Sequence, residues 1–247
     1  MNAPLELPNL IIYPESDGTP MAENTVQFRW IVTLAGNLAA QFRDRPNVFV
    51  AGNQFWYPVE GQPELRAAPD VYVVFGRPKG DRGSYRQWEE GGVPMTVVFE
   101  ILSPGNSYPE MDDKHDFYEE HGAEEYIVYD PERNWLKAFV RRGEVFRAVR
   151  PVHNFVSPRL GIRFDLSGPE MVVYGPGGRK FLTFEELDAA RADAEAARAD
   201  AEAGRADAVR RAARLGELSR KARQGAATAE ELQELERLEE ECTRPPS

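Results

Sequence analysis

The alternation of apolar and polar positions before Phe184 predicts a mixed α/β domain. Between Thr25 and Phe42, apolar side chains recur every three to four positions, which predicts a helix with one buried face. Short runs rich in β-branched and aromatic residues, bounded by polar or turn residues, predict strands. These runs occupy residues 48–51, 55–57, 71–75, 96–102, 126–129, 135–140, 145–149 and 162–164.

Residues 96–129 have the order strand, helix, strand, which indicates a βαβ unit. Ser107 and Glu110 have the spacing of a capping box at the start of the helix, and Gly122 is a candidate for the glycine that ends it. A helical connection makes the two strands parallel, whereas the later runs form antiparallel hairpins. We therefore expect a mixed central sheet with helices packed against it.

The composition divides the chain into residues 1–183 and a helical tail, residues 184–247. In the tail the unit Ala-Arg-Ala-Asp-Ala-Glu-Ala recurs every seven residues, which predicts a long helix. Its seams over residues 187–218 consist mainly of alanine, which buries little area, so a weak coiled-coil homodimer and a solvated single helix are alternatives. A second helix is expected to start at Thr228, with Glu231 completing a capping box.

The composition also limits the function classes. The 247 residues carry a net charge of −11, which argues against a constitutive nucleic-acid binder but not against an enzyme that contacts DNA transiently. The single cysteine, Cys242, excludes an internal disulfide and a multi-cysteine zinc site, and it indicates a reducing compartment. Neither a run of about 20 apolar residues nor a signal-peptide pattern is visible, so we expect a soluble cytoplasmic protein without a membrane segment.

Three charged residues interrupt segments that are otherwise apolar. Asp70 stands at the start of one predicted strand and Glu100 lies inside another, where an unpaired carboxylate costs several kcal/mol. Lys114 lies on the helix that follows Glu100, on the face that we expect to pack against the sheet. Taken singly, Asp70 reads as a strand-end aspartate and Glu100 as an ion-pair partner of Lys114. Taken together, the three residues indicate one site.

Two carboxylates on adjacent strands can hold Mg²⁺, which prefers oxygen ligands and retains several waters. The backbone carbonyl of Ile101, one residue after Glu100, can complete the ligand set, and Mn²⁺ is an alternative ion. Such an ion lowers the pKa of a bound water and neutralises charge on a scissile phosphate. Lys114 can orient that water or stabilise the developing charge. Asp70, Glu100 and Lys114 are therefore the candidate catalytic residues, and Asp70, Glu100 and Ile101 the candidate metal ligands.

Three blocks of sequence follow one another between residues 21 and 149: APDVYVVFGRP, VVFEILSPGN and DDKHDFYEEHGAEEYIVYDPE. Together they resemble the Uma-type family of restriction endonucleases, part of the PD-(D/E)xK nuclease superfamily. The resemblance implies a restriction-endonuclease-like mixed sheet flanked by helices, with Asp70 and Glu100 as the motif acids. Leu102 stands where an E-x-K motif has lysine, and the resemblance implies that Lys114 takes over that role from the next helix.

Related nucleases can also place a polar residue of the first helix in the site. Gln27 is the better candidate because it lies on the buried stripe, and Glu23 is the second; a capping or core role is the alternative for both. The loop 77–90 mixes basic and aromatic residues, as phosphate-contacting surfaces do, but its acidic residues equally suit a mobile mixed-charge loop. The three histidines lack the spacing of a metal cluster.

These observations lead to two hypotheses of different classes. The first is a Mg²⁺-dependent endonuclease that hydrolyses DNA phosphodiester bonds, with DNA as a transient substrate. The second is a catalytically silent nuclease-fold binding or scaffold protein, in which Glu100 and Lys114 form a buried ion pair and the tail self-associates. Binding of a divalent metal ion discriminates between them.

Overall fold

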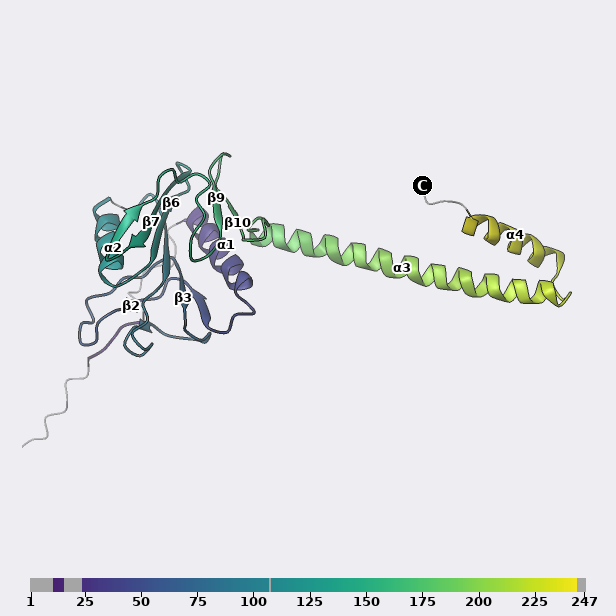
Figure 1. Cartoon of the computed structure of the whole chain (residues 1–247), viewed down its shortest axis with the longest axis horizontal. Coiled ribbons are helices and arrows are strands. Elements are labelled where there is room, and N and C mark those ends of the chain that lie inside the picture. Colours follow the sequence, from purple (N-terminus) through teal and green to yellow (C-terminus); the bar gives the residue numbers. More distant parts are fainter. Residues whose placement is uncertain (1–10, 16–23, 107, 244–247) are drawn as a thin grey trace, which may run out of the picture. The chain divides into compact units, whose positions relative to one another are not determined.

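The computed structural model describes residues 11–15, 24–106 and 108–243 (Figure 1). The chain divides into two compact units, Met1–Phe184 and Glu185–Ser247, and each unit is described by itself. This division falls at the position where the composition changes. Within the described residues, no helix combines the length and the apolar character that a membrane crossing requires.

The first unit is built on a six-stranded mixed sheet. In spatial order its strands are β1 (Val48–Ala51), β3 (Val71–Phe75), β5 (Val97–Ile101), β6 (Glu125–Asp130), β7 (Trp135–Arg142) and β8 (Val145–Ala148). The pair β5–β6 is parallel, and the other neighbouring pairs are antiparallel. This arrangement confirms the mixed sheet, the βαβ unit and the hairpin that the sequence predicts.

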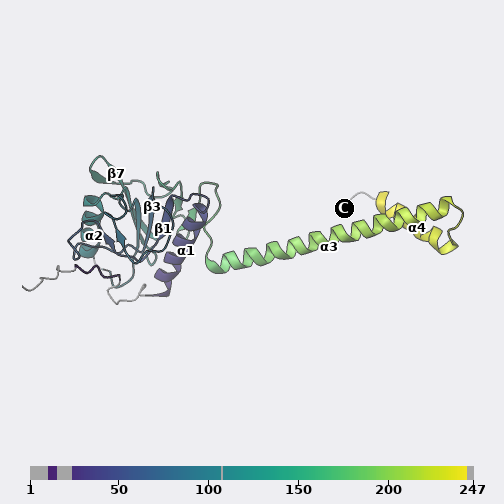
Figure 2. The ribbon, with the colours of Figure 1, turned by 90° about the horizontal axis from the view of Figure 1, so that it is seen from below.

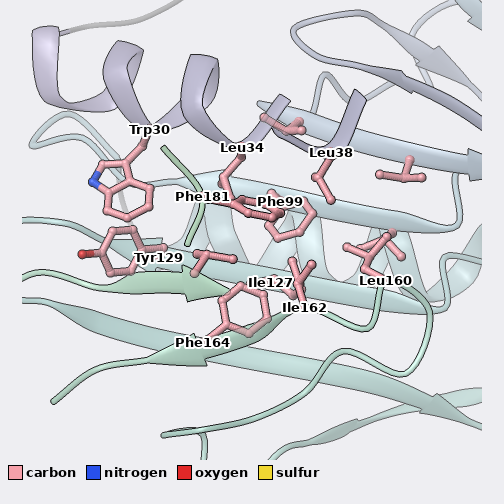
Figure 3. Close-up of a cluster of buried hydrophobic side chains, with 14 of the residues drawn as sticks. Trp30, Leu34, Leu38, Phe99, Ile127, Tyr129, Leu160, Ile162, Phe164 and Phe181 are labelled. Atoms are coloured by element: carbon pink, nitrogen blue, oxygen red, sulfur yellow. The ribbon is translucent and has the colours of Figure 1, made fainter. Parts of the chain in front are cut away.

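Helix α1 (Thr25–Gln41) covers one face of this sheet (Figure 2). The Asn24 side chain caps its start by accepting a hydrogen bond from the Gln27 N–H at 2.8 Å. The buried stripe of the helix packs with residues of β5 and β6 into one core cluster. Figure 3 shows this cluster, which includes Trp30, Leu34, Leu38, Phe99, Ile127, Tyr129, Leu160, Ile162, Phe164 and Phe181.

Helix α2 (Tyr108–Glu120) connects the parallel strands and packs against the opposite face. Because side chains alternate along a strand, Val98 of β5 belongs to this second core, together with Tyr118 of the helix. Gly122 follows the helix with φ of 95°, the left-handed conformation that the predicted terminating glycine requires. The predicted capping role of Ser107 lies outside the described residues.

Two small sheets differ from the sequence prediction. Strand β2 (Trp56–Tyr57) pairs with β4 (Tyr85–Arg86), a strand that lies inside the loop predicted to be polar. Strand β9 (Arg163–Asp165) pairs with β10 (Val172–Tyr174), so the predicted strand 162–164 forms a separate sheet. Burial of aromatic side chains explains the first difference, because both residues of β2 and the tyrosine of β4 are fully buried.

The second unit consists of α3 (Phe184–Arg223) and α4 (Ala229–Thr243). The Thr228 hydroxyl accepts a hydrogen bond from the Glu231 N–H at 3.2 Å, and the Glu231 carboxylate accepts one from the Thr228 N–H at 3.0 Å. This geometry confirms the predicted capping box. Near the carboxyl end of α3, Leu218 is buried, whereas most of the helix before it is exposed.

Candidate active site

Asp70 and Glu100 are brought together by the register of β3 and β5. These antiparallel strands pair Val71 with Phe99, so one step further Asp70 lies beside Glu100. Directly opposed residues of an antiparallel pair point to the same face, with Cβ atoms about 4.5–5.5 Å apart. The Ile101 N–H also donates to Asp70 Oδ2 at 2.6 Å, which fixes the carboxylate against the end of β5.

Glu100 lies at the centre of a buried polar network. Its side chain is only 3% exposed, and Lys114 Nζ approaches Glu100 Oε2 to 2.9 Å. The Tyr118 hydroxyl donates to Glu100 Oε1 at 2.6 Å, so both carboxylate oxygens have donors. The sequence pattern predicts the approach of Lys114 but not the role of Tyr118, because a tyrosine on a packed helical face has the pattern of an ordinary core residue.

The protonation states of Lys114 and Tyr118 follow from this burial. Burial alone would lower the pKa of Lys114, but the charge and hydrogen bond of Glu100 outweigh it and raise the pKa. Burial and the charge of Glu100 also raise the pKa of Tyr118 well above its usual value. At neutral pH, therefore, Lys114 keeps its positive charge and Tyr118 keeps its proton.

The carboxyl of Asp70 has an unusually high pKa. Burial raises the pKa of Asp70, and the charge of Glu100 raises it further, to about 7. The Ile101 N–H, the charge of Lys114 and a hydrogen bond with Gln27 act in the opposite direction. Burial is the larger of the two causes; a divalent cation between the two carboxylates would offset the smaller one, the repulsion from Glu100.

Gln27 links the first helix to the site. Its side chain is buried, and Nε2 donates to the Ile101 carbonyl oxygen at 2.9 Å. The same side chain hydrogen-bonds with Asp70, so one amide contacts both the candidate carbonyl ligand and a candidate acid. The structure thus places Gln27 at the site, whereas the second candidate, Glu23, lies outside the described residues.

The donor set fits a magnesium ion. Two carboxylates and the Ile101 carbonyl are hard oxygen ligands, and each carboxylate oxygen that already accepts one hydrogen bond keeps a second lone pair. Within the described residues, no group of three or more His, Cys, Asp and Glu side chains is arranged to hold a metal. An ion at Asp70 and Glu100 would therefore depend on the carbonyl and on water for the rest of its coordination shell.

A polar chain continues from Lys114 to the loop after β5. Lys114 Nζ lies 3.8 Å from Glu110 Oε1, and Asn106 Nδ2 donates to the same oxygen at 3.3 Å. Asn106 Oδ1 accepts a hydrogen bond from the Ser103 N–H at 2.8 Å. The sequence signal for this polar chain is the Ser-Pro-Gly-Asn segment, which by itself predicts a loop and the start of a helix.

The basic residues of the loop 77–90 are engaged within the protein. Arg77 and Arg82 both pair with Glu90, at 2.8 and 2.6 Å, and the Arg82 guanidinium lies 4.1 Å from the centre of the Phe49 ring. These contacts favour the mixed-charge surface loop over the phosphate-contacting surface. They also fix the loop to itself through Glu90 and to β1 through Phe49.

A cavity of about 530 Å³ opens beside the site, at the ends of β5 and β6. Its lining includes Leu102, two residues after Glu100, Met111, which precedes Lys114 on α2, and Trp135 of β7. The sequence does not predict this cavity, because the residues that form it come from three separate segments of the chain. The position of Leu102 also shows that the residue in place of the E-x-K lysine faces this cavity.

Comparison with known proteins agrees with these observations. The model of the Uma2 family, described as "Putative restriction endonuclease", matches residues 7–167. The chain belongs to this family. That result confirms the resemblance noted in the sequence, and it extends the match at both ends.

Among solved structures, this Uma2-family chain is similar to a protein described as "a putative nuclease belonging to DUF820" from Anabaena variabilis. The two are 13% identical, with a TM-score of 0.37, and the match covers 56% of this chain and 74% of the other. No protein with a curated description matches the chain.

Proposed function

We propose that this Uma2-family protein is a divalent-metal-dependent endonuclease that hydrolyses DNA phosphodiester bonds, with Mg²⁺ as the ion and Mn²⁺ as its substitute. The observation that carries the proposal is a cluster of three charged side chains: the buried Glu100, the partly buried Asp70 beside it at the end of the adjacent strand, and the partly buried Lys114, which reaches Glu100 from α2. Membership of a family described as restriction endonucleases supports the same reaction class.

Asp70, Glu100 and the Ile101 carbonyl would hold the ion, which when bound neutralises charge on the scissile phosphate and acidifies a water. Gln27 orients two of these ligands, because it contacts both Asp70 and the Ile101 carbonyl. Tyr118 holds Glu100 in place through its hydroxyl. Each ligand is therefore fixed by a group that itself lies in packed structure, as a preorganised site requires.

Lys114 serves as a fixed cation in this mechanism. Because its pKa is raised, it stays protonated and donates hydrogen bonds to the attacking water or to the phosphate, and it does not act as a base. Lys114 reaches Glu100 from α2 at 2.9 Å, which supports the proposal that a lysine on this helix takes the role of the E-x-K lysine that Leu102 replaces.

The test is nicking of supercoiled plasmid by the purified full chain with Mg²⁺ or Mn²⁺. We expect nicking by the wild type and loss of at least 100-fold in Glu100→Ala, since the metal and the charge stabilisation are both removed. Glu100→Gln keeps an acceptor for Tyr118 and serves as a second variant if the alanine variant unfolds. Asp116→Ala, which removes an exposed acid from α2, the helix that carries Lys114 and Tyr118, is the matched control and should nick normally.

Cleavage by Glu100→Ala at the wild-type rate would overturn the proposal. The silent scaffold remains the second candidate, because Glu100 is already satisfied by Lys114 and Tyr118 without any ion. Calorimetric titration separates the two functions. Absence of Mg²⁺ and Mn²⁺ binding at millimolar concentration, together with absence of nicking, would favour the scaffold.

A further inference from the structure

The cavity beside the site contains an unusual aromatic side chain. Trp135 opens β7 and is 44% exposed, although tryptophan is normally among the more buried residue types. It lines the cavity of about 530 Å³, a size within the range of about 300–1,000 Å³ that is typical of ligand pockets. An exposed aromatic face on a cavity wall offers a stacking surface for a flat ligand.

The register of the sheet places Trp135 on the same face as the candidate active site. Glu100 pairs with Val128 of β6, and Trp135 pairs with Asp130, two residues further along that strand. With strands about 4.8 Å apart and a rise of about 3.3 Å per residue, the Cα atoms of Glu100 and Trp135 lie roughly 12 Å apart. At this separation, two neighbouring groups of one substrate molecule could lie at Glu100 and at Trp135.

The wall that carries Trp135 is held rigidly. Asp130 is buried, and its Oδ1 accepts hydrogen bonds from the Glu132 and Arg133 N–H groups at 3.0 and 3.1 Å. Its Oδ2 pairs with the Arg133 guanidinium at 2.6 Å. The turn between β6 and β7 is therefore ordered before any ligand binds, which reduces the entropy cost of binding.

The charge of the cavity favours a nucleobase over a phosphate. Asp130 and Glu132 place two carboxylates near the single guanidinium of Arg133, so a phosphate would meet net negative charge. A base, in contrast, brings amino groups that carboxylates accept from, and a π-face that stacks on tryptophan. Leu102 and Met111 complete the wall with apolar surface.

We infer that the cavity binds an unpaired nucleobase, stacked on Trp135, of the same DNA strand whose phosphate lies at Asp70 and Glu100. This inference rests on the proposed nuclease function and names its substrate class. A base inside a duplex is stacked on its neighbours and cannot present its face to Trp135. The preferred substrate is therefore single-stranded or locally unpaired DNA.

The test uses the full chain and a dye-labelled oligonucleotide that contains adenine and cytosine and is long enough to form a stable duplex at low salt, with and without its complementary strand. Binding is followed by the fluorescence anisotropy of a dye on the oligonucleotide, at low salt without divalent metal, so that no cleavage occurs and the signal does not depend on Trp135. We expect the single strand to bind more tightly than the duplex does. Trp135→Ala should weaken binding of the single strand by about tenfold, and Trp135→Phe, which keeps an aromatic face, should retain most of it.

Phe28→Ala is the matched control, because Phe28 is a 50% exposed aromatic residue on α1, against the other face of the sheet. Equal binding by wild type and Trp135→Ala, or equal binding of single strand and duplex, would overturn the inference. Its failure is distinguishable from failure of the proposed function. If only the inference fails, the wild type still nicks plasmid, and replacing Trp135 does not weaken DNA binding. If the proposed function fails, no DNA is cut, although the oligonucleotide still binds through Trp135.

Discussion

In the proposed mechanism, a proton and a metal ion compete for the carboxylate of Asp70. Its carboxyl is buried beside Glu100, and these two influences raise its pKa to about 7. At neutral pH the group is thus divided between its neutral and charged forms. A metal ion binds the charged form, so metal affinity should fall as the pH falls below about 7.

The same pKa makes a prediction for stability. Between the unfolded value of 3.8 and the folded value of about 7, the folded state binds more protons at Asp70 than the unfolded state does. The contribution of this group is therefore complete below about pH 4 and is lost as the pH rises through 7. At about 1.36 kcal/mol per pKa unit, the loss is at most about 4 kcal/mol.

The measurement is chemical denaturation of wild type and Asp70→Asn between pH 4.5 and 8.5. Asparagine cannot ionise, so the free energy of unfolding of wild type should fall relative to the variant over this range. Mg²⁺ at pH 8 should restore stability to the wild type and have a smaller effect on Asp70→Asn. Parallel pH curves for the two proteins would show that Asp70 titrates normally.

The three charged residues of the site could be predicted because each carries a charge in a segment or on a face that is otherwise apolar. A charge in an apolar strand or on a packed helical face needs a partner, so Asp70, Glu100 and Lys114 point to one another from the sequence alone. Tyr118 and Asn106 obey the ordinary rules for a core residue and a turn residue. Their roles depend on tertiary distances, which a single sequence does not contain.

At the scale of elements, the end of β1 determines where Asp70 lies. The Asn53 N–H donates to the Pro69 carbonyl at 2.9 Å, which ties the chain after β1 to the chain before β3. A Cβ atom at Gly52 would lie 2.1 Å from the Asp70 carbonyl oxygen. Only glycine allows this approach of the two backbones, so Gly52 positions Asp70 without contacting substrate.

Gly52→Ala should therefore displace Asp70 and reduce both stability and nicking. We expect a loss of about 1–3 kcal/mol in the free energy of unfolding, as for other substitutions that overpack a close contact, and a loss of nicking beyond what unfolding explains. Gly36→Ala is the control: nothing lies within 4 Å of its Cβ position in α1, so it should stabilise by about 0.5–1 kcal/mol. Equal behaviour of the two variants in denaturation and nicking assays would contradict this role for Gly52.

The elements differ in how far the sequence could predict them. Strands β1 and β3 have the predicted bounds because their apolar runs are continuous and end at polar or turn residues. Strand β2 is predicted one residue longer, at 55–57, whereas β4 is missed, because its two residues are too few for a periodic pattern and lie in a polar loop. What forms them is burial of Trp56 and Tyr85, a tertiary effect that local propensity does not register.

At the scale of the whole chain, helix α4 contacts the carboxyl end of α3 and so limits the part of α3 that a partner can contact. Two ion pairs join α4 to the end of α3: Arg214–Glu234 at 2.8 Å and Lys221–Glu231 at 2.7 Å. They accompany the burial of Leu218. The part of the predicted seam over residues 187–218 that stays open is therefore its amino-terminal part, where alanine predominates.

We predict that this open part forms a weak homodimer. Leu187 is 57% exposed, and the seam continues through alanines at seven-residue spacing, among them Ala201. Ala201→Glu would place a charge in the seam of both chains and should abolish the dimer in sedimentation at high protein concentration. Ala199→Glu places the same charge two residues earlier, on the outer face of such a coiled coil, and should leave the dimer intact. If wild type and Ala201→Glu sediment with the same mass at every concentration, α3 is a solvated single helix, held by its own ion pairs such as Arg191–Glu195.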